Sequence, residues 1–188
     1  MSKIDSLPPY GIAYGSLPQG RHTFRFEVND GFFRRFEGSE ISEGHVSVRV
    51  DAEKAGSFMA LAVGMEGSVK VACDRCLDEF FAPVAFEGTL TVSFTGEAEQ
   101  DGFAEDEVMH LQPGDTEVDL AQYLYESICL SLPMQRLHPN DEQGRSTCNK
   151  DMLAKLHELQ QEARRVKEEN SPWSKLAAAA QRAGSTPK

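Results

Sequence analysis

The chain has 188 residues, which is enough for one domain of ordinary size with one or two appended helices. It carries 19 lysines and arginines against 30 aspartates and glutamates, and this formal net charge of -11 repels a phosphate backbone, which argues against extensive wrapping of RNA. No stretch reaches the roughly 18 apolar residues that span a bilayer, and residues 1–20 lack the apolar block of a signal peptide, so we expect a cytoplasmic protein with no membrane partner.

The first part of the chain changes character near residue 21. Residues 1–20 contain three of the nine prolines and show no periodicity, which predicts an irregular arm. Residues 22–28 alternate between polar and apolar side chains, and so do residues 46–51, which predicts two strands with one buried face each. Between these strands, the phenylalanines of residues 30–37 lie at helical spacing and indicate a short helix.

More strand patterns follow in the middle of the chain. Residues 58–63 and 68–73 flank the tetrapeptide Gly64-Met65-Glu66-Gly67, a glycine-bracketed connection that suits a hairpin. Residues 79–94 alternate over a longer stretch. The length of this last pattern favours a curved sheet.

A polar stretch precedes the first long helix. Residues 97–107 contain six acidic residues and few apolar ones, which predicts a solvated acidic loop, and residues 107–111 predict a short strand after it. Asp119 can cap a helix that runs to about Ser131, because Pro133 cannot continue it. The buried stripe of this helix is expected to be Leu120, Leu124 and Ile128.

The carboxyl-terminal part is expected to be helical. After a polar linker, Asn149 can cap a helix through about Glu169, whose narrow apolar seam needs another helix beside it. The seam consists of Met152, Leu156, Leu159, Ala163 and Val166. Ser171 and Pro172 can begin a last helix over residues 173–181, so the two helices together predict a helical hairpin.

These elements predict an α+β fold, with an antiparallel, barrel-like curved sheet, helices at one end and a C-terminal helical tail. The expected parts are an irregular arm over residues 1–20, an α+β domain over residues 21–148 and a helical hairpin or tail over residues 149–188.

The sharpest local motif is Cys73-Asp74-Arg75-Cys76, a C-x-x-C on a turn between two strands. Both sulfurs of such a turn can bind one tetrahedral zinc ion, and two more ligands must then come from elsewhere in the chain. His138 and Cys148 are the best candidates because they bracket the one polar linker that could fold back over the sheet. We therefore predict a zinc site made by Cys73, Cys76, His138 and Cys148.

Other interpretations of the cysteines stay open. Cys73 continues the apolar face of the strand before it and could be a small core residue. Thiol-disulfide catalysis needs the first cysteine at a helix N-terminus, and here another strand follows instead. Cys129 has no second ligand one turn away and is expected to be structural.

The sequence lacks the usual parts of an enzyme. Its five histidines are scattered, and it contains no nucleophile elbow, phosphate-binding loop or dinucleotide fingerprint. Its carboxylates lie in the acidic loop or on helix faces, where solvation explains them. Acidic neighbours likewise favour solvated faces over a nucleic-acid patch for the basic residues Arg34, Arg35, Arg164, Arg165, Lys167 and Lys175.

Four motifs follow one another along the chain: Cys73-Asp-Arg-Cys-Leu77, the helix from Asp119 to Pro133, the linker from His138 to Cys148, and the tail Ser171-Pro-Trp-Ser-Lys-Leu176. Together and in this order they resemble the YceD family of large-subunit ribosomal RNA accumulation proteins. This resemblance extends from about residue 20 to residue 180. The chain lacks a second compact cysteine pair that some members of the family carry.

The resemblance implies a non-enzymatic role in the accumulation or maturation of large-subunit ribosomal RNA, and it implies no catalytic residue. An acidic protein can act through a basic partner, such as a ribosomal protein, a large-subunit precursor or an RNA-processing factor, with the acidic loop as a docking surface. The alternative hypotheses are a zinc-stapled structural or regulatory module unrelated to RNA, and an unrecognised enzyme.

Overall fold

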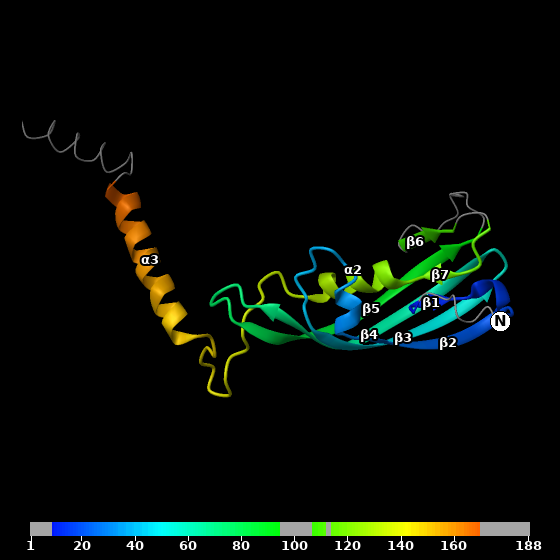
Figure 1. The fold of residues 1–188 in the computed structure, drawn as a ribbon, viewed down its shortest axis with the longest axis horizontal. Helices are drawn as coiled ribbons and strands as arrows, with labels where there is room; N and C mark the ends of the chain where they lie inside the picture. Colours follow the sequence, from blue (N-terminus) through cyan, green and yellow to red (C-terminus); the bar gives the residue numbers. More distant parts are fainter. Residues whose placement is uncertain (1–8, 95–106, 112–113, 170–188) are drawn as a thin grey trace, which may run out of the picture. The chain divides into compact units, whose positions relative to one another are not determined.

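The computed structural model describes residues 9–94, 107–111 and 114–169 of the chain (Figure 1). The chain divides into two compact units. The sheet unit comprises residues 1–72 and 79–136, and the cysteine unit comprises residues 73–78 and 137–188. Each unit is described by itself below.

A five-stranded sheet forms the centre of the sheet unit, and a pair of very short strands accompanies it (Figure 1). The order in the large sheet is β2-β3-β4-β5-β6, with every neighbouring pair antiparallel except β5 and β6, which are parallel. The strands are β1 (Gly11–Ile12), β2 (Gly20–Val28), β3 (Gly44–Ala55), β4 (Phe58–Ala72), β5 (Glu79–Ser93), β6 (Glu107–His110) and β7 (Val118–Asp119). An α+β fold with a mostly antiparallel sheet is thus confirmed.

The expected barrel-like form of the sheet is wrong, because the sheet is open. Its edge strands β2 and β6 are not paired with each other in the described residues. Closing a sheet into a barrel needs a consistent tilt and stagger in every strand. In the described residues β6 is only four residues long and pairs with β5 alone, so it offers few backbone groups for pairing with a further strand.

The hairpin expected around Gly64 and Gly67 is also wrong, because β4 continues through both glycines as one strand of 15 residues. Gly64 pairs with Arg49 and Gly67 with Val46 in unbroken register. A Cβ added at Gly67 would lie 2.1 Å from the carbonyl oxygen of His45, so close backbone approach explains this glycine. Gly67, which we had interpreted as part of a turn, is therefore needed for close packing between two strands.

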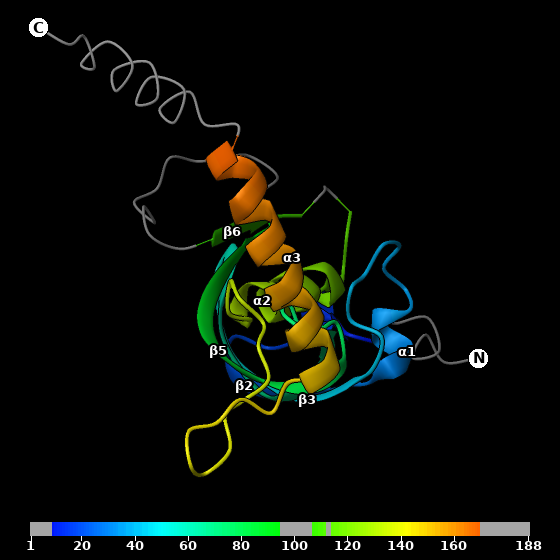
Figure 2. The same cartoon turned by 90° about the vertical axis from the view of Figure 1, so that its left-hand side faces the viewer.

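The core lies on one face of the sheet, where α1 (Asp30–Phe33) and α2 (Ala121–Ser131) pack (Figure 2). The helices thus lie over a face of the sheet and not at one end of it, as the sequence had led us to expect. The N-cap of α2 is Leu120, which makes no side-chain cap bond, and not Asp119 as predicted. The Asp119 carboxylate, one residue earlier, accepts a hydrogen bond from the Ala121 amide at 2.9 Å. The predicted stripe of Leu120, Leu124 and Ile128 is fully buried.

The described start of the chain is more ordered than an irregular arm. Ile12 of β1 pairs with Val118 of β7, a 3-10 turn (η2, Tyr14–Ser16) follows, and the Tyr14 ring stacks on Phe94 with 4.1 Å between ring centroids. Buried apolar side chains explain this order, since Tyr10 and Ile12 are both in the core.

The strands expected over residues 22–28, 46–51 and 79–94 are confirmed, as are the short helix after Val28 and the strand near residue 107. The acidic loop falls almost wholly on residues 95–106, which lie outside the described residues. In the described part of the chain, no helix combines the length and apolar character that crossing a membrane requires.

The described residues of the cysteine unit contain one long helix, α3 (Lys150–Glu169). The side-chain oxygen of Asn149 accepts hydrogen bonds from the amides of Asp151 and Met152, which confirms the predicted cap. Residues 173–181, the expected second helix of a hairpin, lie outside the described residues. The domain boundaries expected at residues 20 and 148 stay a prediction.

Candidate metal centre

A tight turn presents two of the four predicted ligands. The Cys73 amide donates to the carbonyl of Asp78 and the Leu77 amide donates to the carbonyl of Cys73, both at 2.9 Å. These two bonds close the turn, and Leu77 adopts the left-handed backbone conformation at φ 65. Both sulfurs, of Cys73 and Cys76, are buried as a result.

A folded loop brings the other two ligands together. Asn140 and Ser146 form an isolated antiparallel bridge, and the Thr147 hydroxyl donates to the carbonyl of Pro139 at 2.6 Å. The Asp141 carboxylate accepts hydrogen bonds from two amides of the loop, those of Gln143 and Arg145. The two ends of the loop, at His138 and Cys148, therefore lie side by side although ten residues separate them.

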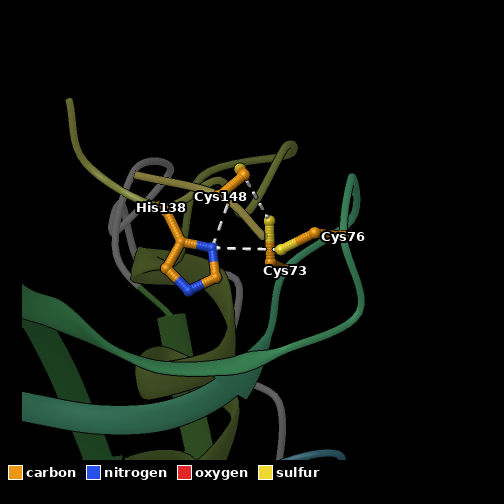
Figure 3. A group of neighbouring side chains, drawn as sticks. All are labelled: Cys73, Cys76, His138 and Cys148. Atoms are coloured by element: carbon orange, nitrogen blue, oxygen red, sulfur yellow. Dashed lines mark hydrogen bonds between the residues drawn. The ribbon is translucent and has the colours of Figure 1, made fainter. Parts of the chain in front are cut away.

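The four ligand atoms converge on one point (Figure 3). The two sulfurs of Cys73 and Cys148 are 3.8 Å apart, and Nδ1 of His138 lies 3.4 Å from the sulfur of Cys76 and 3.8 Å from that of Cys148. All four atoms lie within 4.8 Å of one another.

These distances fit a tetrahedral zinc ion. Zinc-sulfur bonds of about 2.3 Å and zinc-nitrogen bonds of about 2.0 Å at tetrahedral angles give ligand separations of about 3.8 Å between two sulfurs and about 3.5 Å between sulfur and nitrogen. The donor set of three thiols and one imidazole is also one that zinc prefers. The residues present therefore fit this metal in both spacing and chemistry.

The environment of the cluster favours negatively charged sulfur at one position. Burial alone would raise the pKa of Cys73, but hydrogen bonds from the backbone of Arg75 and Cys76 and from His138 outweigh it and lower the pKa to about 6. Burial raises the pKa of Cys76, as do its cysteine neighbours in the cluster. Several thiols in one buried site cannot all ionise easily without a cation between them.

An outer contact supports the cluster. The Asn149 side-chain amide donates to the carboxylate of Asp78 at 3.1 Å, which links the start of α3 to the cysteine turn. Within the cysteine unit, the turn and the loop are thus held together beside the ligands as well as at them. Outer contacts of this kind fix the orientation of metal ligands in proteins.

All four residues predicted as ligands come together in the structure, and the fourth cysteine does not join them. Cys129 is exposed on α2 in the sheet unit. Sequence reasoning missed the left-handed Leu77 and the internal hydrogen bonds of the loop. The residue pair Asn140-Asp141 followed by Gly144 carried a turn signal that could have indicated the folded loop.

Comparison with known proteins gives one match. Residues 61–178 match the family described as large ribosomal RNA subunit accumulation protein YceD, and this range includes all four clustered residues. No curated protein and no solved structure matches the chain. Because the match covers more than half of the 188 residues, the chain belongs to the YceD family.

Proposed function

We propose that this protein is a non-enzymatic ribosome-biogenesis factor that supports the accumulation and maturation of large-subunit ribosomal RNA in the cytoplasm. The family match over residues 61–178 carries the proposal, since family membership implies a role in large ribosomal RNA subunit accumulation. The proposed route of action is binding to a protein or ribonucleoprotein partner.

The net charge of -11 supports a basic partner over direct binding to RNA. A large-subunit ribosomal protein, a precursor particle that displays such proteins, or a basic RNA-processing factor has the complementary sign. Electrostatic attraction of this kind speeds association and weakens with salt.

We further propose that Cys73, Cys76, His138 and Cys148 hold a structural zinc ion. The ion would supply a cross-link between the cysteine turn and the loop, as closed sites with four protein ligands do. Four protein ligands leave no open coordination position for a substrate, which supports a structural role over a catalytic one.

Depletion of the protein tests the main proposal. We expect the ratio of mature large-subunit to small-subunit ribosomal RNA to fall and large-subunit precursors to accumulate, as measured by gradient sedimentation and RNA blotting. Re-expression of the protein should restore the ratio. Unchanged large-subunit maturation in depleted cells would contradict the proposal.

Elemental analysis combined with ribosomal co-sedimentation distinguishes the proposed ribosome-biogenesis factor from the alternative, a zinc-stapled structural or regulatory module. One equivalent of zinc together with sedimentation on large-subunit precursors supports both proposals. Zinc without any ribosomal association favours a structural or regulatory module unrelated to RNA.

A further inference from the structure

The solvent face of the large sheet, opposite α2, carries an unbalanced row of charges. Strand register places Arg25, Arg49, Gly64 and Glu87 side by side across β2, β3, β4 and β5. Arg25 and Arg49 lie directly opposite each other, and the Asp51 carboxylate binds the Arg49 guanidinium and so offsets the repulsion between the two cations. The row therefore holds two cations on one side of Gly64 and a carboxylate on the other.

The next row adds a second carboxylate to the same side. Glu27, Ser47, Glu66 and Ala85 are register partners across the same four strands. Glu66 is thus a diagonal neighbour of Glu87, and both are exposed. Neither carboxylate pairs with another side chain in the part of the chain that the structure describes. The β4-β5 side of this face is therefore negative and uncompensated.

A hollow of about 570 Å³ lies between these charges. Arg25 and Glu27 line it from β2, Arg49 from β3, Glu66 from β4 and Glu87 from β5. The Arg49 guanidinium already binds the Asp51 carboxylate, with Nε 2.9 Å from Oδ2. Gly64 also lines the hollow, and no heavy atom lies within 4 Å of the position that a Cβ added at Gly64 would take.

The glycine at position 64 has no explanation inside the described structure. Gly67, on the same strand, is required by the backbone of its neighbour, whereas a side chain at Gly64 would point into open space. Glycine weakens a strand, and in a strand interior it often marks the close approach of a ligand or of another backbone. The hollow over Gly64 therefore has room for a segment that this chain does not itself supply within its described residues.

The charges decide which kind of segment fits. A nucleic acid would place its phosphates against Glu66 and Glu87, which repel them. A polypeptide with lysine or arginine can instead place its cations between these two carboxylates and direct an acidic side chain or carbonyl toward Arg25. The overall charge of -11 attracts such a basic segment from a distance.

We propose that the hollow over Gly64, rimmed by Arg25, Arg49, Glu66 and Glu87, docks a basic polypeptide segment of a partner protein. The inference rests on the proposed function and identifies the surface through which the protein would bind its partner. The bound segment belongs to a protein carried by large-subunit precursors. Because Gly64 has no side chain, the partner backbone can approach the sheet closely. The carboxylates of Glu66 and Glu87, which pair with no other side chain in the described residues, set the orientation of the bound cations.

The substitution Gly64→Val tests this surface, with large-subunit precursor particles isolated from cells as the probe. A valine side chain on the floor of the hollow prevents the close approach of a partner backbone. It should lower the association constant for the particles by about tenfold or more, since blocking the centre of an interface removes its main contacts. Valine is also a better strand former than glycine, so the melting temperature of the protein should stay the same or rise. The opposite signs of the two effects distinguish a blocked surface from a damaged fold.

Two further variants complete the comparison. Ser68→Val adds a similar side chain to the same strand beyond the hollow, and it should bind particles as the wild type does. The double substitution Glu66→Gln with Glu87→Gln should weaken binding by about tenfold and reduce its dependence on salt.

A photo-crosslinking amino acid in place of Ser47, on the rim, identifies the class of molecule that is bound. We expect it to label a polypeptide rich in lysine and arginine. Labelling of RNA alone would overturn the inference. So would a Gly64→Val protein that binds particles as tightly as the wild type. A wild-type protein that does not bind particles at all would instead remove the proposed function.

Discussion

The two units of this chain are stabilised in different ways. The sheet unit has a continuous apolar core, formed by one face of the sheet together with α1 and α2. Among the described residues of the cysteine unit, only Cys73, Cys76 and Cys148 are buried. Burial of apolar surface can therefore hold the sheet unit together, whereas the cysteine unit depends on the four clustered ligands and a few hydrogen bonds. Together with the zinc site proposed above, the comparison predicts a sheet unit that folds without metal and a cysteine unit that requires it.

Metal removal should have the largest effect, and it should affect one unit only. Structural zinc contributes about 10 kcal/mol or more to the folding of small peptides. The substitution Cys148→Ser, or a strong chelator, should therefore lower the hydrogen-exchange protection of residues 138–148 by about 100-fold or more, with little change in β3 and β4. Exchange measured by mass spectrometry on the purified protein checks both parts.

Cys129→Ser is the matched control, because Cys129 is the one cysteine outside the cluster. Its substitution should leave zinc content and exchange unchanged. Equal protection of residues 138–148 with and without metal would show that the hydrogen bonds of the loop are sufficient.

A single methyl group added to β4 at Gly67 should lower the stability of the sheet unit without affecting the cysteine unit. In Gly67→Ala the added Cβ would meet the His45 carbonyl at 2.1 Å and the Cα of Val46 at 2.7 Å, so β3 and β4 must separate locally. Overpacking of this kind costs about 3 kcal/mol. Urea unfolding followed by circular dichroism should show the corresponding fall in the transition midpoint, with the zinc content unchanged.

Gly64→Ala is the control for this prediction, because its Cβ would meet open space on the same strand. Its unfolding midpoint should equal or exceed that of the wild type, since alanine restricts the unfolded chain more than glycine does. Equal destabilisation by both substitutions would contradict the distinction between the two glycines.

Some features were predictable because local chemistry determines them. The alternation in residues 22–28 and 79–94 follows from having one buried face. The hydrogen bonds that Asp119 and Asn149 accept follow from the unpaired amides of a helix start. The clustering of Cys73 and Cys76 with the ends of the loop was predictable because few residue types bind zinc.

Other features depend on contacts that are distant in sequence, and the sequence pattern could not provide them. In the sequence alone, Gly64 and Gly67 are typical of a turn. The register with β3 shows instead that Gly67 allows the backbone of β3 to lie close to β4. The open edge of the sheet depends on the parallel pairing of β6 with β5, and no local pattern distinguishes a parallel from an antiparallel partner.

The smallest predicted effect concerns the backbone of the cysteine turn, and its sign is unusual. Leu77 is 68 % exposed and has a left-handed backbone, which costs a residue with a Cβ about 1 kcal/mol or more. Leu77→Gly should remove this strain and, after the entropy of the unfolded glycine is subtracted, tighten zinc binding by about two- to fivefold in a chelator competition. Leu77→Ala keeps the left-handed strain and should bind zinc as the wild type does. If both variants instead bound zinc more weakly, the Leu77 side chain would be stabilising the cysteine unit. The stability of this unit would then depend less on the four ligands than its comparison with the sheet unit indicates.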